Sequence, residues 1–531
     1  MMFIDRVVPK PFYSIAISVI LLAAAPALAN SCYTDDADDV RALAERLKSP
    51  KDNEKIDAMF DAAKKIGTVN ALRLITPFFT YSTSYVSDRA IAAFSEAKNP
   101  DAFATVVKES LASTDARVRV AVLESLIRTR VVFSTELLRP IFNDPDEEVK
   151  YLITEVLLQH PPAKAPAELV KFATSQKSAR IRANALIAAA TIEPAVCAQA
   201  IAVAQKDKDS LVRVGALLAQ RAAKGNVESA IVALNDSERR VRLAALEWIR
   251  SARPGSAIAP LIISLTKETG RVKDDVYKTL KNLTLRDFGY DGAAWKTWHD
   301  QVKADFVPPP LPPEKSKGTN NKKTEPAEAD ESRVDTKVDA ARYYDFIVRS
   351  DRVAFLVDTS GSMRAKYTPP GNTSASAEGE KTRLEFAADA LREVIKKLPK
   401  GTKVTIIVFK SEPLLYKKGA KSGSHAVEAT PELADDVHKF VIATGANQTG
   451  NISDSLEYVL DDPEVDTIYL LTDGAPSAGK KHLASRIVAW VGRVTRLSRT
   501  EVNTIGFGAE KKGADFLSDL ADITGGKFDN R

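Results

Sequence analysis

Residues 353–363 read Val-Ala-Phe-Leu-Val-Asp-Thr-Ser-Gly-Ser-Met, an uninterrupted apolar run that ends in an acid and two serines. Such a run is typical of a strand that is buried on both faces of a parallel sheet. Asp358, Ser360 and Ser362 would then lie at the carboxyl end of that strand, where open α/β sheets bind their ligands. One carboxylate and two hydroxyls are ligands that suit a hard divalent cation such as Mg²⁺. The stretch therefore predicts a cation site.

Strands and helices alternate from residue 341 to residue 531, which predicts a mainly parallel, doubly wound α/β sheet. The segment 413–416 is short and is expected at an edge of this sheet. The expected strands are 353–357, 403–409, 413–416, 467–472, 502–507 and 527–529, and the expected helices are 384–398, 435–443, 452–460, 482–497 and 514–524.

Two further loops of this region carry polar residues next to regular elements. Residues 447–450 read Asn-Gln-Thr-Gly before a helix, and residues 470–474 read Leu-Leu-Thr-Asp-Gly at the end of an apolar strand. An isolated Asp-Gly pair is usually a turn. Three such loops in one α/β domain resemble the metal-ion-dependent adhesion site of von Willebrand factor type A domains, and the resemblance covers residues 341–531.

This resemblance implies a set of cation ligands. Ser360 and Ser362 would bind Mg²⁺, or Mn²⁺ or Ca²⁺, directly, Thr449 would bind it directly or through water, and Asp358 and Asp473 would hold coordinated waters. The remaining position would accept an acidic side chain of a protein partner. Because few carboxylates contact the ion directly, the ion would keep positive charge for such a partner.

The second loop departs from the family pattern. The family often has Gly before the Thr, whereas Gly450 follows Thr449 here, so Thr444 and Ser453 remain alternatives. A Gly-, Ser-, Thr- and Pro-rich insertion at residues 364–381 either flanks the site or is an ordinary exposed loop.

Residues 40–303 are expected to form a solenoid of helical repeats. An apolar residue, usually followed by a basic one, recurs at intervals of 29–32 residues before an Ala/Leu-rich helix. The apolar positions are Ile56, Val86, Val118, Val149, Ile181, Val212, Val241 and Val272. The pattern resembles short HEAT-like repeats, each built from two helices.

Two features of the solenoid each have two interpretations. The row of Arg residues is either a binding surface or a set of hydrogen bonds to helix ends and acidic turns, and its recurrence at a fixed position favours the second. The aromatic cluster at residues 288–298 is either a ligand platform or, as we expect, a cap on the last repeat. A proline-rich and charged linker, residues 304–340, separates the solenoid from the α/β domain.

The N-terminus predicts export to the periplasm, the cell envelope or the exterior. Residues 1–29 contain basic residues, an apolar core and an Ala-Leu-Ala ending, which is typical of a signal peptide. An uncleaved anchor and a lipidated Cys32 are alternatives, and no later stretch is expected to span a membrane. Cys32 and Cys197 could form one disulfide, or Cys197 could be a core residue.

Composition and motifs favour a binding protein that is not an enzyme. A net charge of +5 over 531 residues, with no basic and aromatic cluster, gives no reason to expect nucleic-acid binding. None of the five histidines lies in the first metal loop, and Ser360 and Ser362 lack an evident general base. A metal-assisted hydrolase and a structural scaffold with a non-functional metal site are the alternative functions.

Overall fold

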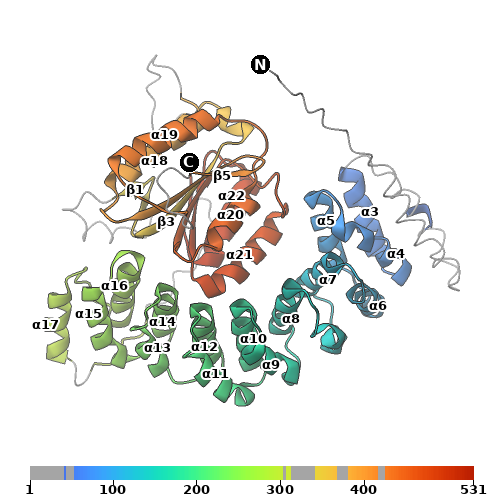
Figure 1. The fold of residues 1–531 in the computed structure, drawn as a ribbon, viewed down its shortest axis with the longest axis horizontal. Coiled ribbons are helices and arrows are strands. Elements are labelled where there is room, and N and C mark those ends of the chain that lie inside the picture. The colour runs from blue at the N-terminus through green and yellow to red at the C-terminus, as the bar shows by residue number, and fades with distance from the viewer. Residues whose placement is uncertain (1–40, 44–52, 303–305, 312–340, 368–380, 417–424) are drawn as a thin grey trace, which may run out of the picture. The chain divides into compact units, whose positions relative to one another are not determined.

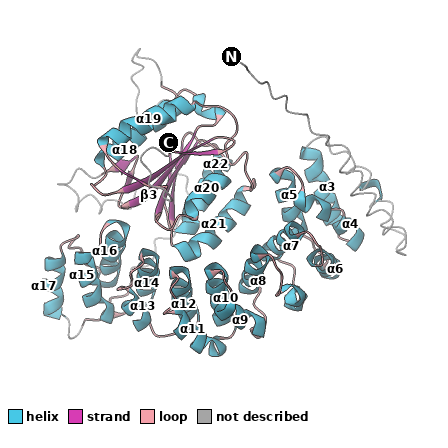
Figure 2. Ribbon diagram, in the orientation of Figure 1, coloured by secondary structure: helices cyan, strands magenta, loops and turns pink. Residues whose placement is uncertain are grey.

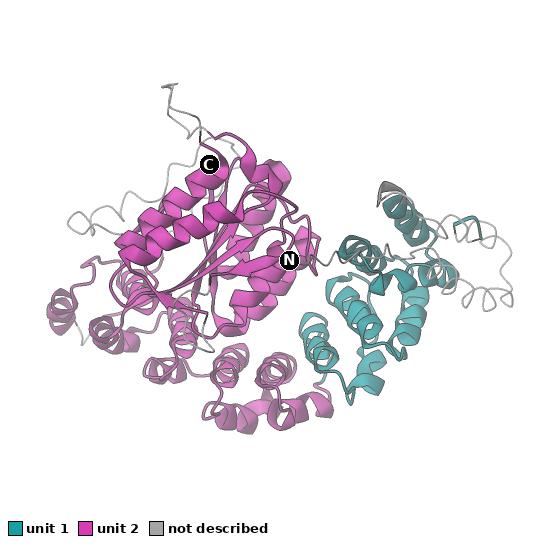
Figure 3. Cartoon of the chain, turned by 45° about the horizontal axis from the view of Figure 1, so that its top comes forward, with its two compact units in different colours: residues 1–164 teal, residues 165–531 magenta. Residues whose placement is uncertain are grey.

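The computed structural model describes residues 41–43, 53–302, 306–311, 341–367, 381–416 and 425–531. The predicted signal peptide, Cys32, most of the predicted linker and the middle of the 364–381 insertion lie outside these ranges. The chain divides into two compact units, residues 1–164 and 165–531 (Figure 3). No helix within the described ranges is both long and apolar enough to cross a membrane.

Both units contain the predicted helical repeats (Figure 1). Asp115, Asp146, Ser178 and Asp209 each cap the second helix of a repeat, because their side chains accept hydrogen bonds from the first free backbone N–H groups. The first unit contains α3 (Asn53–Ile66), α4 (Val69–Arg73), α5 (Ser84–Ser95), α6 (Pro100–Leu111), α7 (Ala116–Arg128) and α8 (Glu147–Gln159). The second contains α9 (Ala167–Ser175), α10 (Ala179–Ile192), α11 (Ala198–Ala204), α12 (Ser210–Ala222), α13 (Glu228–Ala233), α14 (Arg239–Ala252), α15 (Ile258–Lys267), α16 (Gly270–Thr284) and α17 (Gly292–Val302).

The recurring Arg residues join neighbouring repeats, as expected. Arg213 donates to the backbone carbonyl of Asp207 at 2.9 Å, and its Nε donates to Asp236 in the next repeat at 2.8 Å. Three other members of the row repeat this arrangement in their own repeats: Arg119 with Asp144, Arg182 with Asp207, and Arg242 with Glu268. These Arg residues therefore donate hydrogen bonds to backbone carbonyls at helix ends and to the carboxylates of acidic turns.

The aromatic cluster covers the last repeat, as the cap interpretation predicts. Trp295 is fully buried, its indole N–H donates to the carbonyl of Gly289 at 2.9 Å, and its ring meets Phe288 edge to face. Its helix α17 packs against α15. Cys197 is buried, and burial raises the pKa of its thiol to about 11.

The α/β domain contains one large sheet, whose strands are magenta in Figure 2. The strand order is β5-β4-β3-β7-β8-β9, with β6 also paired to β4. The pairs β3–β4, β3–β7, β7–β8 and β8–β9 are parallel, and the short β5 lies at an edge, as predicted. The strands are β3 (Arg352–Asp358), β4 (Lys403–Phe409), β5 (Pro413–Leu415), β6 (Val427–Glu428), β7 (Thr467–Thr472), β8 (Glu501–Gly506) and β9 (Phe528–Asn530). A hairpin of β1 (Arg342–Tyr343) and β2 (Phe346–Ile347) precedes them.

Helices cover both faces of this sheet. Phe355 of β3 packs in the core under α18 (Arg383–Lys397) and α19 (Pro431–Thr444). Its neighbour Leu356 packs in the opposite core, under α20 (Ile452–Leu460), α21 (Ala484–Ser498) and α22 (Lys511–Thr524). This double coverage explains why β3 is apolar throughout. Helix α19 begins earlier than predicted, because Thr430 caps it and Pro431 occupies its first position.

Within the second unit, α14 and α16 contact the edge of the sheet at which the parallel strands begin. Arg239 of α14 pairs with Asp351, immediately before β3. Arg271 of α16 donates to the backbone carbonyls of Asp466 and Arg499, before β7 and β8. The edge that carries Asp358 and Asp473 is the opposite one, so these contacts leave it uncovered.

Candidate cation site

Asp358 ends β3 and is almost fully buried, with 2% of its surface exposed. Its Oδ1 accepts the backbone N–H of Ser360 at 2.7 Å, and its Oδ2 accepts the hydroxyl of Thr472 at 2.5 Å. Burial raises the pKa of the Asp358 carboxyl to about 6, against the lowering effect of these hydrogen bonds, and the charge of Asp473 adds to the increase. A bound cation would compensate the negative charge of this buried carboxylate.

The two serines and Asp473 form a continuous row of oxygen atoms. Ser360 Oγ lies 3.1 Å from Ser362 Oγ, and Ser362 Oγ donates to Asp473 Oδ1 at 2.8 Å. Arg383, at the start of α18, donates from Nη1 to the other oxygen of Asp473 at 2.7 Å. The structure thus brings together four of the predicted residues, Asp358, Ser360, Ser362 and Asp473.

The second predicted loop is bound to the first through its backbone. The N–H of Asn447 donates to the carbonyl of Thr359 at 3.0 Å, and the N–H of Gly361 donates to the carbonyl of Gln448 at 2.9 Å. Thr449 is exposed, whereas the next residue, Gly450, is buried against the site. A Cβ placed on Gly450 would lie 3.5 Å from Asp358 Oδ2. Gly450 therefore packs beside Asp358, and Thr449 precedes it as an exposed residue of the same loop.

The two alternatives to Thr449 have partners elsewhere. The hydroxyl of Thr444 donates to the carbonyl of Phe440 at 2.9 Å, inside α19. The hydroxyl of Ser453 donates to Asp454 at 3.0 Å and accepts the N–H of Lys481.

Three residues near the site did not emerge from the sequence: Thr472, Arg383 and Ser477. Thr472 lies within the apolar strand that ends at Asp473, so its place beside Asp358 could have been inferred from the parallel pairing of β3 and β7. Arg383 and Ser477 carry no comparable sequence signal. Among the described residues, no three His, Cys, Asp or Glu side chains gather into a metal site, so the candidate site depends on serine hydroxyls.

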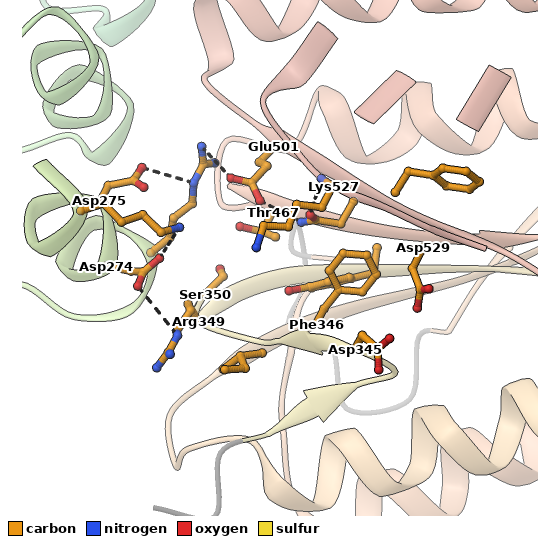
Figure 4. A pocket seen from close by; sticks show the side chains of 16 residues that line it. Asp274, Asp275, Asp345, Phe346, Arg349, Ser350, Thr467, Glu501, Lys527 and Asp529 are labelled. Atoms are coloured by element: carbon orange, nitrogen blue, oxygen red, sulfur yellow. Dashed lines mark hydrogen bonds and ion pairs between the residues drawn. The ribbon is translucent and has the colours of Figure 1, made fainter. Parts of the chain in front are cut away.

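A cavity of about 360 Å³ lies between α16 and the α/β domain (Figure 4). Several of its charged side chains pair with one another. Lys278 binds Asp274 at 2.7 Å, Arg271 lies 3.6 Å from Glu501, and Arg349 lies 3.8 Å from Asp274. The first pair lies within α16, and the other two join α16 to the α/β domain, which gives the cavity walls a structural role.

A match to a family model agrees with the architecture of the α/β domain. Residues 353–475 match the family model described as von Willebrand factor type A domain. A solved von Willebrand factor type A structure from Catenulispora acidiphila is 16% identical, with a TM-score of 0.27, over 34% of this chain and 38% of its own. An engineered protein is 18% identical, with a TM-score of 0.27, over 51% of this chain and 85% of its own. No curated protein matches the sequence.

Proposed function

Because this chain carries a von Willebrand factor type A domain at residues 353–475, we propose that it is a non-enzymatic binding protein that captures a protein partner through a divalent cation. The observation that carries the proposal is the convergence of Asp358, Ser360, Ser362 and Asp473 at the carboxyl edge of the sheet. Ser360 and Ser362 would hold the ion directly, and the two carboxylates would hold its waters. No histidine lies in the three loops to act as a general base.

The donor atoms fit a small, hard cation. The two hydroxyl oxygens that would bind the ion directly, Ser360 Oγ and Ser362 Oγ, are separated by 3.1 Å. Adjacent ligands of an octahedral Mg²⁺ with bonds of about 2.1 Å are separated by about 3.0 Å. Oxygen donors favour Mg²⁺, with Mn²⁺ or Ca²⁺ as alternatives.

The charge of the site supports an acidic partner. Asp358 and Asp473 carry two negative charges when ionised, and the guanidinium of Arg383 cancels one of them. A divalent cation would therefore keep about one net positive charge, which attracts a carboxylate of a partner. The bound ion supplies electrostatic attraction and an open coordination position.

Thermal unfolding with Mg²⁺ or with EDTA tests the cation site. We expect Mg²⁺ to raise the unfolding temperature of the parent, since a ligand that binds only the folded state stabilises it. Asp358→Ala should lose this increase, and Asp522→Ala, which removes an exposed acid on α22, should keep it. A parent that responds identically to Mg²⁺ and EDTA would contradict the proposal. Capture of a partner from envelope extract should then be abolished by EDTA.

The proposal includes export and a second binding surface. The helical repeats offer an extended surface of the kind that repeat proteins use for binding. Export depends on the signal peptide predicted at residues 1–29, so the protein should be found in the envelope or exterior fraction with a new N-terminus near residue 30. An intact N-terminus on a protein retained in the cytoplasm would contradict export.

A further inference from the structure

The starts of two solenoid helices carry arginines that contact the α/β domain. Arg239 and Arg240 are the first two residues of α14, and Arg271 is the second residue of α16. Arg242, two residues after Arg240, belongs to the recurring row and binds the next repeat instead. Since an α-helix has about 3.6 residues per turn, residues two positions apart project from nearly opposite sides. The solenoid therefore uses one set of arginines for its own repeats and another for the α/β domain.

Two of these arginines bind main-chain carbonyls of the α/β domain. Arg240 Nη2 donates to the carbonyl of Pro463 at 3.2 Å. Arg271 Nη1 donates to the carbonyl of Arg499 at 2.8 Å and also to that of Asp466, and its side chain is only 13% exposed. These carbonyls lie just before β7 and β8, so the contacts fix where the two strands begin relative to α14 and α16.

Acidic residues of the α/β domain complement the charge of these arginines. Glu501 Oε2 lies 3.6 Å from Arg271 Nη2. The carboxylates of Asp462 and Glu464 exert an attractive charge on Arg240. Opposite charges that meet across an interface favour one orientation of the two partners. The contact between the solenoid and the α/β domain is therefore complementary in charge.

Gly270, the first residue of α16, allows the α/β domain to approach closely. Its φ is +57°, and a Cβ at this position would overlap the carboxylate of Asp351 and lie 3.0 Å from the backbone nitrogen of Asp351. The hydroxyl of the preceding residue, Thr269, donates to Asp351 Oδ2 at 3.0 Å. A side chain at position 270 would displace Asp351, so the surface of the solenoid is fitted to the α/β domain in shape as well as in charge.

We propose that the starts of α14 and α16 form a binding surface for the chain's own α/β domain, and that this surface holds the domain without help from the peptide that joins them. The surface binds the amino edge of the sheet, at which the parallel strands begin. This part of the solenoid is then occupied and does not bind another protein. The inference is independent of the cation, because Asp358 and Asp473 lie at the opposite edge.

Cutting the full chain between its two parts tests the inference. A specific protease site inserted into the predicted linker, within residues 315–336, allows the chain to be cut there. We expect the two fragments to elute together in gel filtration at low ionic strength, in Mg²⁺ and in EDTA alike. High salt should weaken their association, because screening reduces the attraction between charges. Parent fragments that separate at low ionic strength would overturn the proposal, whether or not the protein binds a cation.

Charge reversal at Arg271 tests the surface itself. Arg271→Glu places a carboxylate beside Glu501, so we expect the dissociation constant of the cut fragments to rise at least about thirtyfold. Lys267→Glu reverses an exposed charge at the end of α15 and should stay within about twofold of the parent. Association of Arg271→Glu fragments that matches the parent would show that this surface does not hold the domain.

A charge exchange separates a lost contact from a misfolded variant. Arg239→Asp places two carboxylates against each other, because Arg239 pairs with Asp351, and should weaken the association of the cut fragments. Adding Asp351→Arg restores opposite charges and should recover about tenfold of the lost affinity. A double variant whose fragments associate no better than those of Arg239→Asp would overturn the assignment of this surface.

Discussion

Arg239 on α14 and Asp351 before β3 form a hydrogen-bonded ion pair between a helical repeat and the α/β domain. Arg239 Nη2 donates to Asp351 Oδ2 at 3.0 Å, and Nη1 contacts the other carboxylate oxygen and also Asp466. The pair is partly buried, and the neighbouring Thr269 donates to the same carboxylate. A two-point contact of this kind fixes direction as well as distance.

A double-mutant cycle should detect this pair. We expect Arg239→Ala and Asp351→Ala each to destabilise the second unit, and the double variant to lose less than the sum, with a coupling energy of about 1–3 kcal/mol. Lys267→Ala, which removes an exposed cation at the end of α15, is the matched control and should change stability little. Additive losses in urea unfolding would show that Arg239 and Asp351 do not interact.

The same pair predicts a dependence of stability on pH. Burial raises the pKa of Asp351, but the hydrogen bond and charge of Arg239 outweigh it and hold the pKa below its usual value. When folding lowers the pKa of a carboxyl, the carboxyl stabilises the folded state at pH values above its pKa in the unfolded chain, which is about 3.9. This stabilisation is lost as the pH falls through the pKa that the carboxyl has in the folded protein. The difference in unfolding free energy between the parent and Asp351→Asn should therefore be constant above about pH 5 and shrink below about pH 4. A difference that grows on acidification would contradict this assignment.

The pair of Arg119 and Asp144 allows the structural role of the recurring Arg residues to be tested in the first unit. Their side chains are 9% and 5% exposed, so Arg119→Ala would leave the buried charge of Asp144 unpaired, at a cost of about 3–5 kcal/mol. Arg117, two residues earlier, is 75% exposed in its pair with Asp115, and Arg117→Ala should cost less than about 1 kcal/mol. Thermal unfolding of the full chain compares the two. Equal effects would mean that the buried pair has no special role.

Most strands and helices of the α/β domain could be predicted from the sequence, because the core strands are continuous apolar runs. The observed bounds of β4, β7 and α20 agree with those expected. The strands β1, β2 and β6 were missed because each has two residues, too few for any periodicity. Tertiary pairing alone defines such short strands.

Part of the candidate site was predictable for the same reason. Asp358 and Asp473 follow apolar strands, and parallel neighbours bring their carboxyl ends to one edge of the sheet. A loop carries no such register, so the sequence does not show that Gly450, the residue after the predicted ligand Thr449, packs beside Asp358. Ser477 lies 27 residues from Gly450, and Arg383 lies 90 residues from Asp473, so only the fold brings each pair together.

Arg383 should control the affinity of the site for cations. Its guanidinium lies 2.7 Å from Asp473, and its positive charge would repel a divalent cation bound at the candidate site. Arg383→Gln keeps a hydrogen-bond donor and removes the positive charge, so we expect Mn²⁺ to bind about tenfold more tightly. Arg383→Lys keeps the charge and should bind Mn²⁺ like the parent. Weaker binding by Arg383→Gln, with unchanged thermal unfolding in EDTA, would mean that Arg383 serves the site by positioning Asp473 rather than by opposing the ion.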